Sequence, residues 1–111
     1  MRVIVRVRPF NETERTRGDQ AVTHIAADSR SMQLKTQSGG GREMVKNFRF
    51  ATVLGSATTQ ASFFATSGIQ SLIDSAIGGY SACCFAYGQT GSGKTYTVSG
   101  LEEKIGAWRC M

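Results

Sequence analysis

The sequence contains few histidine and cysteine side chains, and these are not spaced for a zinc site. It has one histidine and three cysteines, Cys83, Cys84 and Cys110. Two of the cysteines are adjacent and no C-x-x-C pair occurs, so neither a zinc site nor a disulfide framework is indicated. We therefore expect Cys83 and Cys84 to be buried, reduced thiols, as in a cytosolic protein.

Long apolar runs are also missing. No stretch is long enough to cross a bilayer, and no apolar segment of the signal-peptide kind follows the N-terminus. Membrane insertion and a cleavable signal peptide are therefore not expected. With 111 residues, 41% of them hydrophobic, the chain is predicted to be one small domain over residues 1–111 with a modest core.

Runs of one charge are missing too, although the net charge is +5. Arg2, Arg6 and Arg8 form the only dense basic group, and no signature of a nucleic-acid-binding module occurs. We therefore expect no nucleic-acid partner. A nucleotide or an acidic protein surface would suit the charge, and general solubility is the alternative explanation.

The N-terminal half of the sequence predicts short strands separated by polar loops. β-Branched residues favour a first strand that Pro9 ends, and the turn residues 28–30 predict a hairpin. Phe48 and Phe50 alternate onto one face of a later strand. The predicted strands span residues 2–8, 21–27, 31–36 and 46–50, and the predicted loops span residues 11–20 and 37–42.

The C-terminal half predicts a helix followed by a buried strand. Apolar residues at spacings of three and four favour one continuous helix over residues 60–77, capped by Thr58 or Thr59 and weakened by Gly68. The uninterrupted apolar run at residues 81–87 is typical of a strand inside a parallel sheet. A helix, such a strand, a loop and a further helix start together predict an α/β fold.

The loop after that strand carries the most informative motif. Residues 88–95 match the phosphate-binding pattern G-x-x-x-x-G-K-[ST] in full, between a predicted strand and a predicted helix. The glycines allow the backbone N–H groups to face phosphate oxygens, the lysine adds a positive charge, and the threonine hydroxyl can hold Mg²⁺. The alternative is an ordinary Gly/Ser turn. The predicted phosphate-binding residues are Gly88, Gln89, Thr90, Gly91, Ser92, Gly93, Lys94 and Thr95, with Thr95 also the predicted metal ligand.

Taken together, these residues resemble the N-terminal part of a kinesin motor domain. The opening at residues 5–11 is similar to the family's first strand with its R-x-R-P motif, and residues 79–97 give the strongest match. The resemblance covers residues 2 to about 106 and implies a P-loop NTPase-type sheet flanked by helices, incomplete in this chain. It also implies ATP and Mg²⁺ as cofactors, microtubules (tubulin) as partner and a cytoplasmic, cytoskeletal location. It gives no oligomeric state.

The resemblance further implies an adenine site. Kinesins hold adenine between the proline of R-x-R-P and a ring just after the loop's threonine, which here are Pro9 and Tyr96, and Arg6 matches the arginine beside the base. Arg8 is a weaker member of the set. A proline face and an aromatic ring can sandwich a purine with little hydrogen-bond readout. The alternatives are that Pro9 only ends a strand and that Tyr96 lies on a helix surface.

The sequence departs from the family pattern in two respects. Ala51 stands where the family usually has an aspartate after its F-x-F pattern, and neither the Ser-Ser-Arg-Ser-His nor the Asp-Leu-Ala-Gly switch segment occurs in these 111 residues. We therefore interpret the chain as the ATP-binding part of a motor head, without assignable catalytic residues. A shortened non-motor nucleotide-binding or interaction protein, and another P-loop kinase or GTPase, are the alternatives.

Overall fold

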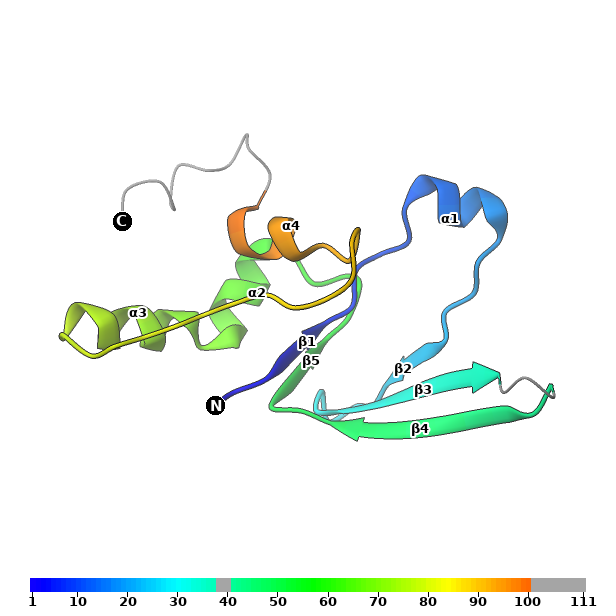
Figure 1. Ribbon diagram of the computed structural model, residues 1–111, viewed down its shortest axis with the longest axis horizontal. Coiled ribbons are helices and arrows are strands. Elements are labelled where there is room, and N and C mark those ends of the chain that lie inside the picture. The colour runs from blue at the N-terminus through cyan, green and yellow to red at the C-terminus, as the bar shows by residue number, and fades with distance from the viewer. Residues whose placement is uncertain (38–40, 101–111) are drawn as a thin grey trace. The chain divides into compact units, whose positions relative to one another are not determined.

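The computed structural model describes residues 1–37 and 41–100. The chain divides into two compact units, Met1–Thr58 and Thr59–Met111, and each is described by itself. The first unit contains all the described strands and one short helix, joined by loops, and the described part of the second unit contains helices and loops (Figure 1). Helices and strands are thus both present, as the α/β prediction requires.

Two short parallel strands hold the core of the first unit. β1 (Ile4–Arg6) pairs with β5 (Thr52–Leu54), with Val5 opposite Val53. Val53 is 2% exposed. β1 is shorter than the predicted strand over residues 2–8, although bonds from Ala51 N to Val3 O and from Val7 N to Leu54 O continue the pairing at both ends.

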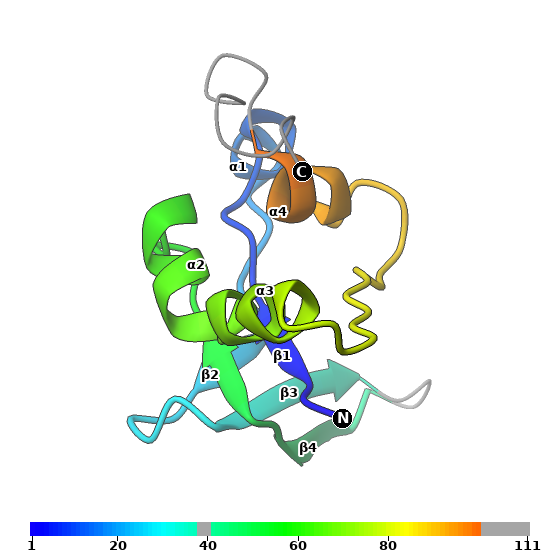
Figure 2. The same cartoon turned by 90° about the vertical axis from the view of Figure 1, so that its left-hand side faces the viewer.

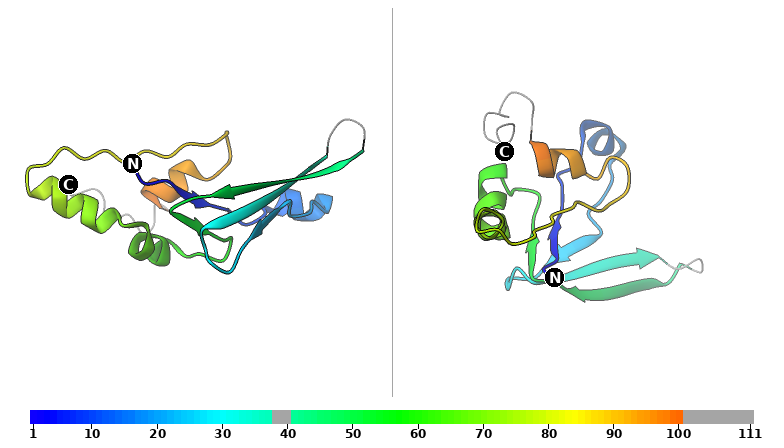
Figure 3. Two further views of the ribbon diagram at one scale, coloured as in Figure 1. Left: turned by 90° about the horizontal axis from the view of Figure 1, so that it is seen from below. Right: turned by 60° about the vertical axis from the view of Figure 1, so that its left-hand side comes forward.

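The predicted hairpin is confirmed. β2 (Thr23–Ile25) pairs antiparallel with β3 (Ser31–Gln37), which pairs in turn with β4 (Glu43–Arg49). Figure 3 shows β3 and β4 as one long twisted ribbon. At the turn, the Asp28 carboxylate accepts hydrogen bonds from the Arg30 and Ser31 amides, which lowers the pKa of Asp28 to about 2.

Two of the remaining predictions for this unit also hold in part. The predicted strand over residues 46–50 begins earlier and ends at Arg49, and the rings of Phe48 and Phe50 lie 6.3 Å apart. The predicted glycine loop over residues 37–42 includes residues 38–40, which lie outside the described residues. Gly41 has a left-handed φ of 77°, as a glycine-rich turn allows.

The predicted loop over residues 11–20 was wrong, because α1 (Glu12–Arg17) lies there. Asn11 caps the helix in a capping box: its side chain accepts from the Glu14 amide, and the Glu14 carboxylate accepts from the Asn11 amide. Gly18 closes the helix in the left-handed conformation. These local bonds outweigh the polar composition that favoured a loop, and the spacing of Asn11 and Glu14 was the missed signal.

The predicted continuous helix of the second unit is two helices. α2 (Gln60–Ser67) and α3 (Ile69–Ile77) are separate in Figure 2. Gly68 between them has a φ of 79°, a left-handed conformation that ends α2 instead of merely weakening it. Thr59 is the cap of α2, since its side chain accepts from the Ser62 amide at 3.2 Å.

The predicted buried strand over residues 81–87 was also wrong. The segment is irregular chain, and all seven residues are exposed, with Phe85 at 76% and Tyr87 at 96%. Cys83 and Cys84 are therefore exposed free thiols, not buried ones. An apolar strand of this kind needs neighbouring strands for its backbone groups, and the described strands pair only in the β1–β5 and β2–β3–β4 sheets. Within the described ranges, no helix is long and apolar enough to cross a membrane.

Candidate functional site

The glycine-rich loop of residues 88–95 leads directly into α4 (Lys94–Ser99). Gly91 and Gly93 have φ values of 78° and 91°, which L-residues with side chains rarely adopt. A bond from Ser92 N to Gln89 O at 3.2 Å closes a turn inside the loop. The backbone is thus curled at the glycine positions, as the motif predicted.

Gly88, the first residue of the loop, lies close to the side chain of Ser92. A Cβ atom built on Gly88 would lie 2.5 Å from Ser92 Oγ and 3.2 Å from Ser92 Cβ. Real Cβ atoms essentially never approach other atoms within 3.0 Å. Glycine at position 88 is therefore what allows the loop to close this tightly.

Lys94 lies across the loop. Its ammonium group donates to the carbonyl oxygens of Gly88 and Gln89, each at 2.8 Å. The loop therefore holds a positive charge at its centre while the Thr95 side chain, the next residue of α4, is exposed. Tyr96 is 40% exposed. This arrangement offers a cation, a hydroxyl and an aromatic face within three consecutive residues.

A side chain of α2 anchors this helix, and no motif in the sequence singled it out. Gln60, at the start of α2, donates through Nε2 to the Thr97 carbonyl oxygen of α4 at 2.8 Å, in a partly buried position. The two residues are 37 positions apart in the sequence. Because no local pattern signals such a contact, sequence reasoning used Gln60 only as a helix start. The bond fixes the helix that carries Lys94 and Thr95.

Replacing Gln60 with glutamate tests this anchor with an isosteric side chain. A carboxylate cannot donate to Thr97 O, whereas a negative charge at the start of α2 favours that helix. We expect the amide protons of Thr97 and Gly100 in and after α4 to exchange about five-fold faster, since a hydrogen bond contributes about 1 kcal/mol. The Phe63 amide of α2 should not exchange faster. Hydrogen-exchange NMR measures both.

A matched control is Gln33→Glu, an exposed position on β3. It should leave exchange in α4 unaltered. Unchanged α4 exchange in the Gln60 variant, or equal acceleration in both helices, would show that the bond does not anchor α4.

The other predicted site residues, Arg6, Arg8 and Pro9, lie in the first unit. Arg6 donates through Nη2 to Thr58 O at 3.2 Å, and Pro9 is exposed. Arg8 and Pro9 line an open groove of about 490 Å³ that lies wholly within this unit. The loop and Tyr96 belong to the second unit, so the predicted adenine sandwich stays a prediction.

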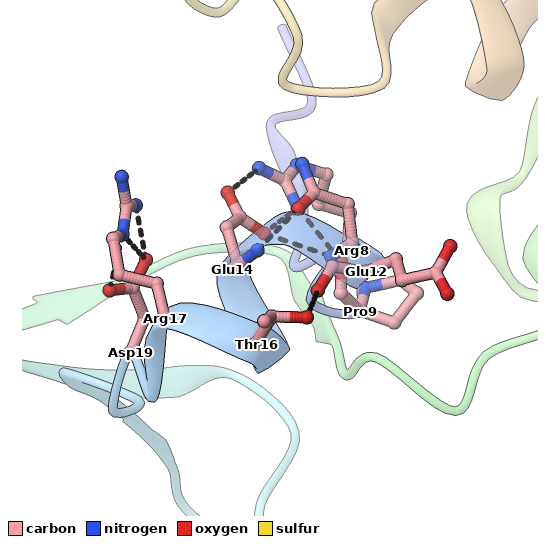
Figure 4. A network of polar contacts seen from close by, with 8 residues as sticks. Arg8, Pro9, Glu12, Glu14, Thr16, Arg17 and Asp19 are labelled. Atoms are coloured by element: carbon pink, nitrogen blue, oxygen red, sulfur yellow. Dashed lines mark hydrogen bonds and ion pairs between the residues drawn. The ribbon is translucent and has the colours of Figure 1, made fainter.

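The side chain of Arg8 is hydrogen-bonded to a residue of α1 (Figure 4). Its guanidinium donates to both carboxylate oxygens of Glu14, Nη1 to Oε2 at 2.7 Å and Nη2 to Oε1 at 2.5 Å, and Nη1 also donates to Pro9 O at 2.9 Å. The hydrogen bonds from Arg8 and from the Asn11 amide lower the pKa of Glu14 to about 2. Arg8 was predicted from the sequence as a residue of the nucleotide site, whereas Glu14 was not.

Two comparisons with known proteins point to the same family. The kinesin motor domain family model matches residues 6–110. Similar proteins include kinesin-like protein KIN-14D of Oryza sativa subsp. japonica, 45% identical over 103 residues, which cover 93% of this chain and 10% of that protein. Kinesin-like protein KIF12 of Mus musculus is 38% identical over 100 residues, covering 90% of this chain and 14% of that protein. The chain thus spans only a small part of the length of these relatives.

Proposed function

The chain belongs to the kinesin motor domain family, and we propose that it is the ATP-binding part of a microtubule-dependent motor ATPase. The observation that carries the proposal is the closed loop of residues 88–95, with the Lys94 ammonium across it and α4 directly after it. Movement along microtubules and a cytoskeletal, cytoplasmic location are part of the same proposal, since they belong to the whole protein of which such a domain is a portion.

The residues of the loop fit a magnesium nucleotide. Lys94 donates to two carbonyl oxygens 2.8 Å away, so phosphate oxygens can replace these acceptors without moving the lysine backbone. The exposed Thr95 hydroxyl is an oxygen ligand of the type that Mg²⁺ prefers. When bound, Mg²⁺ supplies positive charge to the outer phosphates. The amides of Gly91 and Gly93 belong to the part of the loop whose curled backbone suits anion binding.

For the base, we propose Pro9, Tyr96 and Arg6. Pro9 is exposed and Tyr96 is 40% exposed, and a proline face and an aromatic ring can bind a purine by dispersion and stacking. We also propose that residues 1–111 are part of a P-loop NTPase-type domain, since the kinesin motor domain model matches residues 6–110.

A nucleotide panel tests the proposal against another class of P-loop protein. The 111-residue chain should bind Mg·ATP more tightly than Mg·GTP, because the family resemblance implies an adenine site, in which the additional polar groups of guanine would be left without hydrogen-bond partners. Fluorescence titration with labelled nucleotides measures both affinities. Tighter binding of Mg·GTP would favour the alternative of a GTPase, and binding of neither nucleotide would contradict the proposal.

Hydrolysis should not follow binding in the isolated chain. The segments by which the family positions water and senses the γ-phosphate do not occur in these 111 residues, and phosphoryl transfer depends on such positioning. We therefore expect no microtubule-stimulated turnover in a steady-state ATPase assay with and without microtubules. Stimulated turnover by the isolated chain would refute this expectation. Binding without turnover would equally suit a shortened, non-motor nucleotide-binding protein.

A further inference from the structure

One carboxylate organises the segment between β1 and α1. Glu14, in the first turn of α1, accepts hydrogen bonds from Nη1 and Nη2 of Arg8 and from the backbone N–H of Asn11. Arg8 also donates a hydrogen bond to the carbonyl oxygen of Pro9. Pro9 lies between Arg8 and Glu14 in the sequence and belongs to the proposed base site. Figure 4 shows the Arg8 and Glu14 side chains facing each other above the Pro9 backbone.

These contacts fix the segment that contains Pro9 at both of its ends. Its N-terminal end is held by the two-pronged Arg8–Glu14 pair, which has a defined geometry as well as attraction. Its C-terminal end is held by the capping box of Asn11 and Glu14. Pro9 itself is exposed, so the network leaves its ring free to contact a ligand.

We propose that Glu14 is a positioning residue for the nucleotide base: it holds Arg8 and the Asn11 amide so that the ring of Pro9 is presented in one fixed orientation. The inference rests on the proposed function. Its physical basis is preorganisation, since a binding face that is already ordered loses less conformational entropy when the base binds.

The charges of the pair agree with this role. The hydrogen bond from Arg8 is the largest cause of the lowered pKa of Glu14, and the bond to Glu14 raises the pKa of Arg8. Both side chains are therefore ionised at neutral pH. On this proposal Arg8, which the family resemblance implies for the nucleotide site, serves that site through its contact with Pro9.

The competing explanation is that Glu14 only stabilises α1. The same helix offers a control, because Arg17 and Asp19 form a second ion pair near its other end, away from residues 8–11. A helix-stabilising role would make Asp19→Asn and Glu14→Gln similar in their effects. A positioning role affects only the second of these, and only for ligands that carry a base.

The experiment measures the affinities of the 111-residue chain and its variants for Mg·ATP and for magnesium tripolyphosphate, which has the phosphates but no base. Glu14→Ala should weaken Mg·ATP binding about ten-fold, within the range that one base stack is worth. Binding of tripolyphosphate should stay within about two-fold, since the loop of the second unit is untouched. Glu14→Gln keeps an acceptor for the Asn11 amide and should show a smaller loss, again for Mg·ATP alone.

The outcomes separate this inference from the function on which it rests. An unchanged Mg·ATP affinity in both Glu14 variants, an equal loss for the two ligands, or an equal loss in Asp19→Asn overturns the positioning role while the proposed function stands. Failure of the unaltered chain to bind Mg·ATP overturns the proposed function itself. The glutamine variant decides the matter even if the alanine variant loses α1, because its capping bond remains.

Discussion

Lys94→Met should weaken Mg·ATP binding by about 100-fold, because hydrogen bonds to a charged group contribute roughly 1.5–3 kcal/mol each and 1.4 kcal/mol is a factor of ten. The structure shows that Nζ reaches two acceptors across the loop at 2.8 Å, so more than one phosphate contact would be lost together. Methionine keeps the length and apolar stem of the side chain and removes only the charge and its donors. Isothermal titration of Mg·ATP measures the effect.

Lys46→Met is the matched control for this prediction. Lys46 lies in β4, is exposed, and belongs to the first unit, so its loss removes one positive charge without touching the loop. Its variant should bind Mg·ATP with nearly unaltered affinity. If both lysine variants lost the same amount, general charge attraction would explain the binding, and the loop would have no special part in it.

Gly88→Ala should have the second largest effect, a loss of Mg·ATP affinity of about ten-fold or more. The added methyl group forces the loop to move, and we expect this movement to cost more than about 1.4 kcal/mol, which is a factor of ten in affinity. The added methyl group would lie 2.5 Å from Ser92 Oγ and 3.2 Å from Ser92 Cβ. The hydroxyl can rotate away, but Ser92 Cβ is fixed by the backbone, so the loop itself must open. Titration of Mg·ATP and of tripolyphosphate should show the same loss.

Two companion variants make this prediction specific. Gly91→Ala adds a methyl group where nothing lies within 4 Å, so it carries only the cost of a left-handed backbone, roughly 1–2 kcal/mol. Gly88→Ala combined with Ser92→Gly removes the colliding side chain and should recover part of the affinity. No recovery in the double variant would mean that the contact between residues 88 and 92 is not what closes the loop.

The parts of the fold that the sequence predicted are those with strong local signals. The hairpin turn at residues 28–30 and the Thr59 cap both depend on side chains bonding to amides two or three residues away. The same class of signal was present at Asn11 and Glu14, and polar composition outweighed it wrongly. At Gly68 the predicted effect was too small. The glycine was expected only to weaken the helix, but its left-handed conformation ends a helix that the apolar periodicity would have continued.

The parts that were not predicted depend on contacts distant in sequence. The apolar run at residues 81–87 has strand composition, but in the described chain it has no strand partner and stays exposed. Gln60 and Glu14 have ordinary residue types, and only the structure brings one to Thr97 and the other onto Arg8. The motif at residues 88–95 located the candidate site, whereas the residues that hold its parts in position could be identified only from the structure.

The most direct test of the central claim, that the loop of residues 88–95 cradles the phosphates of an adenine nucleotide, is an amide NMR titration of the 111-residue chain with Mg·ATP. We expect the largest shifts at the amides of Gly91, Gly93, Lys94 and Thr95, and in Lys94→Met we expect the shifts to require an Mg·ATP concentration about 100-fold higher. Saturating Mg·ATP that leaves these amides unshifted, or shifts concentrated in β3 and β4, would contradict this claim.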